Sequence, residues 1–213
     1  MDDFIIYSGY LLLLVNLILY SYSFFIKKKG ISFYVVFLVF SFLLQMISEV
    51  LFLLKMNNLV LFNFFFIGQM VLLGLFYNKL MQTIRQKTFI ICSIILGLMV
   101  LSVNFFLEPS QFFKFNLFQI ALTSLLVVVF AMMHLYNILA GEKEFYYVTI
   151  GMIIYLLGST VLFFVGNLTI GLSTEFKFFT WTLNAILVVL NQLFVLFEWK
   201  NSFYKKAVQT KLC

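Results

Sequence analysis

The residues with the clearest chemical potential are a glutamine and a glutamate in the apolar stretch "LLQMISEVLFLL", residues 43–54. Gln45 and Glu49 are four residues apart, so in a helix their side chains lie on one face. A charge at the centre of a bilayer costs about 2.5–3.5 kcal/mol on insertion scales, and less near the interface. An acid within a membrane span, such as Glu49, therefore indicates recognition of a ligand or cation, or a proton-titrating switch. The competing interpretation is a hydrogen bond that only joins two helices.

The composition predicts an integral membrane protein. The chain is 64% hydrophobic and 10% charged, whereas soluble domains carry roughly 25% charged residues. A bilayer core requires about 20 helical residues per crossing. We therefore predict an all-α polytopic membrane protein, a seven-transmembrane-helix bundle over 1–199 followed by a short basic tail over 200–213. The seven apolar runs cover roughly 4–26, 31–54, 59–78, 88–107, 115–139, 146–167 and 178–199.

The distribution of positive charge predicts the orientation of the chain. Of the 14 Lys and Arg residues, all but Lys55, Lys114 and Lys177 fall in the odd-numbered connections or the tail. Cytoplasmic loops carry this excess of positive charge. We expect the N-terminus outside and the C-terminus in the cytoplasm. The basic residues form short clusters between apolar runs, a pattern that excludes a nucleic-acid groove and leaves the lipid bilayer as the expected partner.

Polar side chains are concentrated in the half of the predicted bundle that faces outside. We predict a ligand pocket there, open to the exterior. Gln119 on the fifth run and Ser159 on the sixth lie at the same depth, whereas the inward half is thinner in polar residues, with Asn16, His134 and Gln192 among them. The predicted ligand-binding residues are Glu49, Gln45, Asn63, Gln69 and Asn184.

Enzymatic chemistry is not expected. The sequence contains no HExxH, GxSxG, Walker A or CxxC motif. Glu49 has no second acid at its depth to share acid–base work. His134 is the only histidine and has no Cys, Asp or second His at ligand spacing, so we expect no metal site. The last run contains no lysine for a retinal Schiff base, and we expect no cofactor.

A weak internal similarity raises the possibility of a duplication. "SEVLF" (48–52) resembles "STVLF" (159–163), and residues 63–79 match 184–200 without a gap at five of seventeen positions. A three-plus-one-plus-three arrangement would make Glu49 the counterpart of Thr160, and Asn63 the counterpart of Asn184. Transporters built from repeats place their ligand between the two halves.

Two stretches, "FYYVTIGMIIYLLGSTVLFF" (145–164) and "WTLNAILVVLNQLFVLFEWK" (181–200), carry a family resemblance. They resemble the last two helices of bacterial seven-helix membrane modules found alone or ahead of sensor histidine kinase domains. The shared pattern is aromatic-x4-G-x3-Y-x2-G, met here by Tyr147, Gly151 (one residue early), Tyr155 and Gly158. Glu49, followed by Asn57–Asn58, also fits these modules.

The resemblance implies a multi-pass protein of the bacterial inner (cytoplasmic) membrane with a sensory role. Only about thirteen residues follow the seventh run, with no kinase or other effector among them. A signal is therefore expected to pass to a separate membrane or signalling protein. Two alternatives stay open: an accessory subunit of a membrane protein complex, and a small transporter or channel with the three-plus-one-plus-three repeat.

Overall fold

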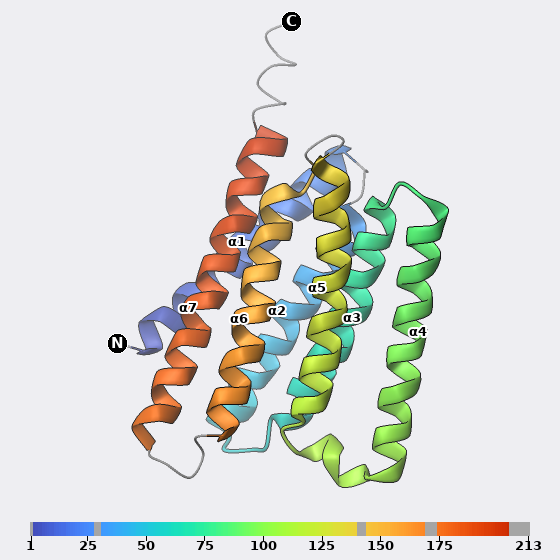
Figure 1. Ribbon diagram of the computed structural model, residues 1–213. Helices are drawn as coiled ribbons and strands as arrows, with labels where there is room; N and C mark the ends of the chain where they lie inside the picture. Colours follow the sequence, from blue (N-terminus) through green and yellow to red (C-terminus); the bar gives the residue numbers. More distant parts are fainter. Residues whose placement is uncertain (1, 28–30, 140–143, 169–173, 205–213) are drawn as a thin grey trace, which may run out of the picture. The chain divides into compact units, whose positions relative to one another are not determined.

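The computed structural model describes residues 2–27, 31–139, 144–168 and 174–204, and over these residues it contains helices and no strand. Figure 1 shows their order. A short 3₁₀ helix, η1, follows α4, and a π-helical turn, η2, follows α7. The elements are α1 (Asp2–Lys27), α2 (Ile31–Leu53), α3 (Leu59–Leu80), α4 (Ile84–Leu107), η1 (Pro109–Phe113), α5 (Leu117–Leu139), α6 (Tyr146–Leu168), α7 (Thr174–Trp199) and η2 (Lys200–Tyr204).

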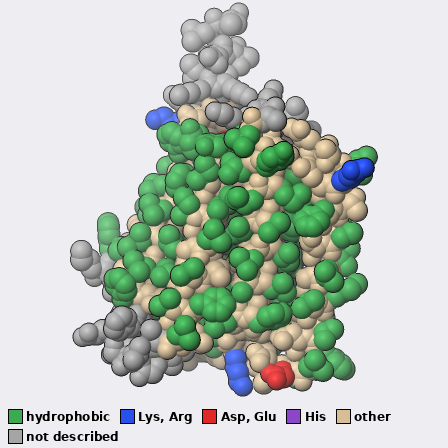
Figure 2. Space-filling view, in the orientation of Figure 1, with side chains coloured by type: hydrophobic (Ala, Val, Ile, Leu, Met, Phe, Trp, Pro, Cys, Tyr) green, Lys and Arg blue, Asp and Glu red, His purple; other side chains and the backbone are tan. Residues whose placement is uncertain are grey.

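All seven α-helices are long and apolar enough to cross a membrane. The prediction of an all-helical chain with seven spanning helices is therefore confirmed, and it is the architecture of a multi-pass membrane protein. Figure 2 shows hydrophobic side chains spread over the face in view, with the visible charged side chains near its upper and lower edges. The direction in which the helices cross stays a prediction.

Helix ends are set by local hydrogen bonds as well as by hydropathy. At the end of α2, Met56 N–H donates to Leu51 O at 2.9 Å, while Lys55 has a φ of 56°. This is the Schellman arrangement, in which a left-handed residue closes the helix. At the start of α4, the Thr83 hydroxyl accepts a hydrogen bond from Gln86 N–H. This cap starts α4 at Ile84, four residues before the predicted run.

The chain divides into two compact units. The first unit combines Met1–Lys28 with Ala131–Cys213, and the second unit is the continuous segment Lys29–Phe130. Each unit is described separately below. The grouping of helices, α1 with α6 and α7, and α2 with α3 and α4, does not follow the halves of the repeat considered from the sequence.

In the first unit, α6 and α7 lie side by side (Figure 1) and approach closely at glycines. A methyl group built on Gly151 would lie 2.7 Å from Phe194 Cβ, and one on Gly158 would lie 2.7 Å from Leu187 Cδ1. Gly151 and Gly158 are seven residues apart and therefore lie on one face of α6. Small residues let helices pack at short range where van der Waals contact drives association.

A row of hydrogen bonds joins α1 to α7, which run parallel. Asn16 Nδ2 donates to the Gln192 backbone O at 2.8 Å and to Gln192 Oε1 at 2.9 Å. One turn further, Tyr20 donates to Val195 O at 3.1 Å. The Trp199 indole N–H then donates to Ser23 Oγ at 2.7 Å. These polar residues therefore serve interhelical packing within the first unit.

In the second unit, α3 packs between α2 and α4. The Phe40 ring of α2 lies over Gly68 of α3 and stacks with Phe65 at a centroid distance of 6.4 Å. On the other side, Gly74 of α3 faces Ile94 of α4. Both pairs of helices are antiparallel and joined by short connections.

Replacing Gly151 with alanine is expected to destabilise the first unit by about 1–3 kcal/mol, because overpacked cores must shift backbone or side chains. The new methyl would meet Phe194 Cβ, which cannot move without α7, as well as Asn191 Oδ1 at 3.1 Å. Gly9→Ala is the matched control, since its methyl meets Val188 and Val189 at 3.5 and 3.6 Å. We expect it to be neutral or stabilising by up to about 1 kcal/mol. Unfolding in mixed detergent micelles compares the two, and equal losses would contradict the packing argument.

Candidate functional site

The polar face of α2 is turned into the protein. Ser41, Gln45 and Ser48 recur at the spacing of one helix face. Ser48 Oγ accepts a hydrogen bond from Asn58 Nδ2 at 3.0 Å. Ser41 Oγ and Gln45 Oε1 are buried and have no hydrogen-bond partner among the described residues. Glu49, one turn from Gln45, is half-buried.

Gln69 brings a third buried polar group to this pair of helices. It lies on α3 beside Gly68, against which Phe40 packs, and is therefore at the level of Ser41 on α2. Its side chain is 1% exposed, and its Oε1 has no hydrogen-bond partner within the described part of the chain. We call Ser41, Gln45, Glu49 and Gln69 the α2–α3 polar site. The oxygens of Ser41, Gln45 and Gln69 can accept hydrogen bonds and have no partner among the described residues. Glu49 adds a carboxylate to the same site.

Asn63 has a different environment, at the first turns of α3. It is fully buried, and its Nδ2 donates to Phe112 O at 2.7 Å and to Lys114 O at 3.1 Å. Both carbonyls belong to the connection between α4 and α5, which includes η1. This amide therefore fastens that loop to α3, a structural use that hydropathy did not reveal.

Gln119 of α5 completes the environment of Asn63. Its Nε2 donates to the Asn63 backbone O at 2.7 Å, and its backbone N–H donates to Asn116 Oδ1 at 3.1 Å. Asn116 Nδ2 in turn donates to Asn104 Oδ1 at 3.3 Å. These four amides link α3, α4 and the start of α5 inside the second unit.

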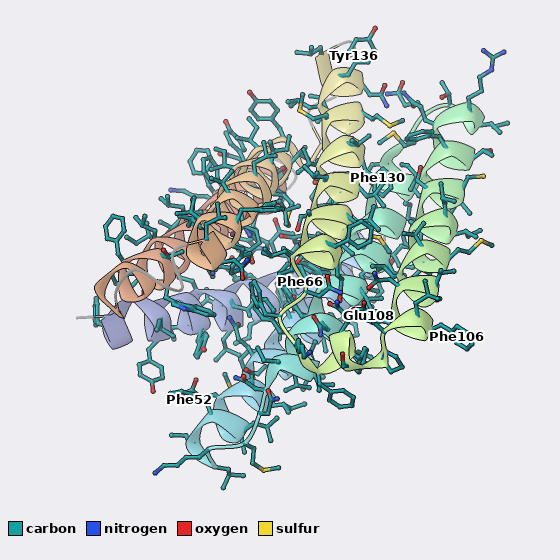
Figure 3. The ribbon with its side chains drawn as sticks, turned by 60° about the horizontal axis from the view of Figure 1, so that its bottom comes forward. Phe52, Phe66, Phe106, Glu108, Phe130 and Tyr136 are labelled. Carbon is teal, nitrogen blue, oxygen red and sulfur yellow. The ribbon has the colours of Figure 1, made fainter. Side chains whose placement is uncertain are left out.

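Aromatic residues adjoin this amide group in the chain and pack on one another. Phe62 packs edge-to-face on Phe66 at a centroid distance of 4.8 Å and against Phe115 at 5.5 Å. Phe66 is 3% exposed and lies among packed side chains, whereas Phe106 is 85% exposed and points away from α4 (Figure 3). Glu108 lies exposed on the loop itself (Figure 3), where it accepts a hydrogen bond from Gln111.

The predicted site residues thus fall into three places. Gln45, Glu49 and Gln69 belong to the α2–α3 polar site, and Asn63 belongs to the loop attachment in the same unit. Asn184 lies on α7 in the first unit, where its Oδ1 accepts a hydrogen bond from Ser159 at 2.8 Å. Asn184 is therefore described only with α6 and α7.

A buried acid near the end of α7 is not among the residues predicted from the sequence. Glu198 is 1% exposed; its Oε2 accepts the backbone N–H of Tyr147 at 2.8 Å, and its Oε1 accepts the hydroxyl of Ser202. A carboxylate at a helix N-terminus satisfies a free donor and complements the helix dipole. The available signal was the acid in "LFEWK" (196–200), placed next to a tryptophan at the end of an apolar run.

Within the described ranges, no three His, Cys, Asp or Glu side chains come together as a metal site. The oxygen-rich groups here are amides and carbonyls, whose chemistry suits hydrogen-bond donors and hard cations. Comparison with known proteins adds no relative: no family model, curated protein or solved structure matches this chain.

Proposed function

We propose that this chain is a receptor-like sensory protein of the bacterial inner membrane that binds a small, amine-bearing ligand at the α2–α3 polar site. The observation that carries the proposal is the pair of buried amide oxygens, Gln45 Oε1 and Gln69 Oε1, that have no donor among the described residues. Leaving a buried acceptor unsatisfied costs about 1–3 kcal/mol. A ligand that supplies N–H groups recovers that free energy on binding.

Glu49 selects the charge of the ligand. It is half-buried on the same helix as Gln45, so a cationic amine would gain an electrostatic interaction that a neutral amide would not. In the predicted orientation, Glu49 lies toward the outside, where such a ligand arrives. The basic connections on the opposite side would face the separate signalling partner.

The test is thermal unfolding of the detergent-purified protein against a panel of small amines and matched neutral amides. A bound ligand at 100 times its Kd stabilises by about 2.7 kcal/mol, which corresponds to a Tm rise of several degrees for a chain of this size. We expect at least one amine to raise Tm in the wild type, and the rise to be lost in Glu49→Gln and Gln69→Leu. Glu144→Gln, an exposed acid in the first unit, is the matched control and is expected to keep the rise.

The outcome that contradicts the proposal is a panel with no stabilising amine, or a rise that survives in both site variants. Two further measurements address the alternative functions. A stoichiometric partner found by mass spectrometry after mild-detergent purification would favour the accessory subunit. Substrate flux in proteoliposomes that Glu49→Gln abolishes would favour the transporter.

A further inference from the structure

Two buried amides in the second unit, Asn63 and Gln119, have their orientations fixed by carbonyl groups. Asn63 Nδ2 faces the carbonyls of Phe112 and Lys114, and Gln119 Nε2 faces the carbonyl of Asn63. Turning either amide over would place oxygen against oxygen, so neither can be reversed. Asn63 Oδ1 and Gln119 Oε1 are therefore true acceptors, and neither has a hydrogen-bond partner among the described residues.

These two oxygens belong to one cluster. Gln119 Nε2 contacts the Asn63 carbonyl, and Asn63 Nδ2 contacts the Phe112 and Lys114 carbonyls, so the two side chains and the loop carbonyls are neighbours. The loop carbonyls of Phe112 and Lys114 accept from Asn63 Nδ2, and a carbonyl oxygen has a second lone pair for another partner. Both side chains are fully buried. The cluster thus combines two fully buried amide oxygens with carbonyls of the adjoining loop.

The charges around the cluster define what it can hold. The oxygens are neutral, and the acid of the adjoining loop, Glu108, is exposed and accepts from Gln111. Divalent cations are usually held by carboxylates as well as carbonyls. A single positive charge requires less compensation, and carbonyl oxygens can replace the water shell of such an ion. The Phe62 and Phe115 rings, each next to an asparagine of this group in the chain, stack on each other at a centroid distance of 5.5 Å.

We propose that Asn63, Gln119 and the carbonyls of Phe112 and Lys114 form a binding site for a monovalent cation, either an alkali ion or ammonium. This site is separate from the α2–α3 polar site and uses none of its residues. By binding oxygens from α3, α5 and the intervening loop, the ion stabilises the attachment of that loop to the helices.

The test is thermal unfolding of the purified full chain in chloride salts of sodium, potassium, ammonium or N-methyl-D-glucamine at equal ionic strength. Comparing sodium and potassium with ammonium shows whether the site prefers an alkali ion or ammonium. N-methyl-D-glucamine is too large to enter a buried site. We expect Tm to rise by about 2–4 °C in at least one small-cation salt, the scale for a modest binding free energy in a chain of this size. The rise should saturate when that cation is titrated.

Three variants locate the effect. Gln119→Met removes the oxygen at similar length, so the cation-dependent rise should vanish. Gln119→Glu keeps an oxygen and adds charge, so the rise should occur at lower cation concentration, and it decides the matter if Gln119→Met does not fold. Gln111→Met, a half-buried loop position outside the proposed set of ligands, should keep the wild-type response. An equal Tm of the wild type in all four salts overturns the proposal, as does an unchanged response in Gln119→Met.

Discussion

Asn63→Asp is expected to destabilise the second unit by about 2–5 kcal/mol, since each buried group left without its partner costs about 1–3 kcal/mol. The substitution keeps the shape of the side chain and replaces both N–H donors with oxygen. That oxygen would face the carbonyls of Phe112 and Lys114, which now accept at 2.7 and 3.1 Å. Even if the new carboxyl takes up a proton, only one of the two carbonyls regains a donor.

The same substitution six residues earlier provides the control. Asn57 is exposed, and its Oδ1 accepts the backbone N–H of Leu59 at 2.9 Å, a role that an aspartate oxygen fills equally well. Because Leu59 begins α3, a negative charge there also complements the helix dipole. We expect Asn57→Asp to change stability by less than about 0.5 kcal/mol.

Unfolding in mixed detergent micelles measures both variants, and limited proteolysis of the α4–α5 connection reports whether the loop has been released. Both measurements are repeated in N-methyl-D-glucamine chloride, where no small cation offsets the added charge. Similar stability losses in Asn63→Asp and Asn57→Asp would show that the two loop contacts do not contribute as the structure indicates.

The second large effect is expected at Glu198. Glu198→Leu should cost about 1–3 kcal/mol, because it leaves the backbone N–H of Tyr147 buried without an acceptor. The carboxylate is 1% exposed and accepts that N–H at 2.8 Å. Glu198→Gln retains an amide oxygen for Tyr147 and can donate to Ser202, so it should be milder.

Hydrogen exchange at the first turn of α6 gives the specific readout. Glu198→Leu should accelerate exchange over residues 146–150, and Glu198→Gln should leave most of the protection. Glu108→Leu removes an exposed acid that accepts a hydrogen bond from Gln111 of its own loop, and we expect a stability change of less than about 0.5 kcal/mol from it. Unchanged exchange in Glu198→Leu would contradict the capping role.

The helices were predictable because lipid imposes length and composition on every spanning segment. The residues at which the helices begin and end were less predictable. Arg85 and Lys87 were assigned to a connection, yet α4 begins at Ile84 and includes both. Charge marks the edge of the membrane, whereas a helix continues into water wherever a cap such as Thr83 supports it.

The candidate site was predictable in part. Spacing placed Gln45 on the polar face of α2, and the structure buries its amide oxygen. The use of Asn63 was not predictable, since its partners are backbone carbonyls of Phe112 and Lys114, which any residue type would supply. Glu198 was missed for a similar reason, because its principal partner is a backbone N–H.

The row of hydrogen bonds between α1 and α7 has a consequence for synthesis. Asn16 meets Gln192 across 176 residues of chain, so α1 leaves the ribosome well before α7 and has to wait for it. The second unit is continuous over Lys29–Phe130 and can form all its own contacts earlier. Domains fold as units during synthesis. Assembly should therefore begin with the second unit and end when α1 joins α7. Chaperones and quality-control proteases would meet α1 before α7 has been made.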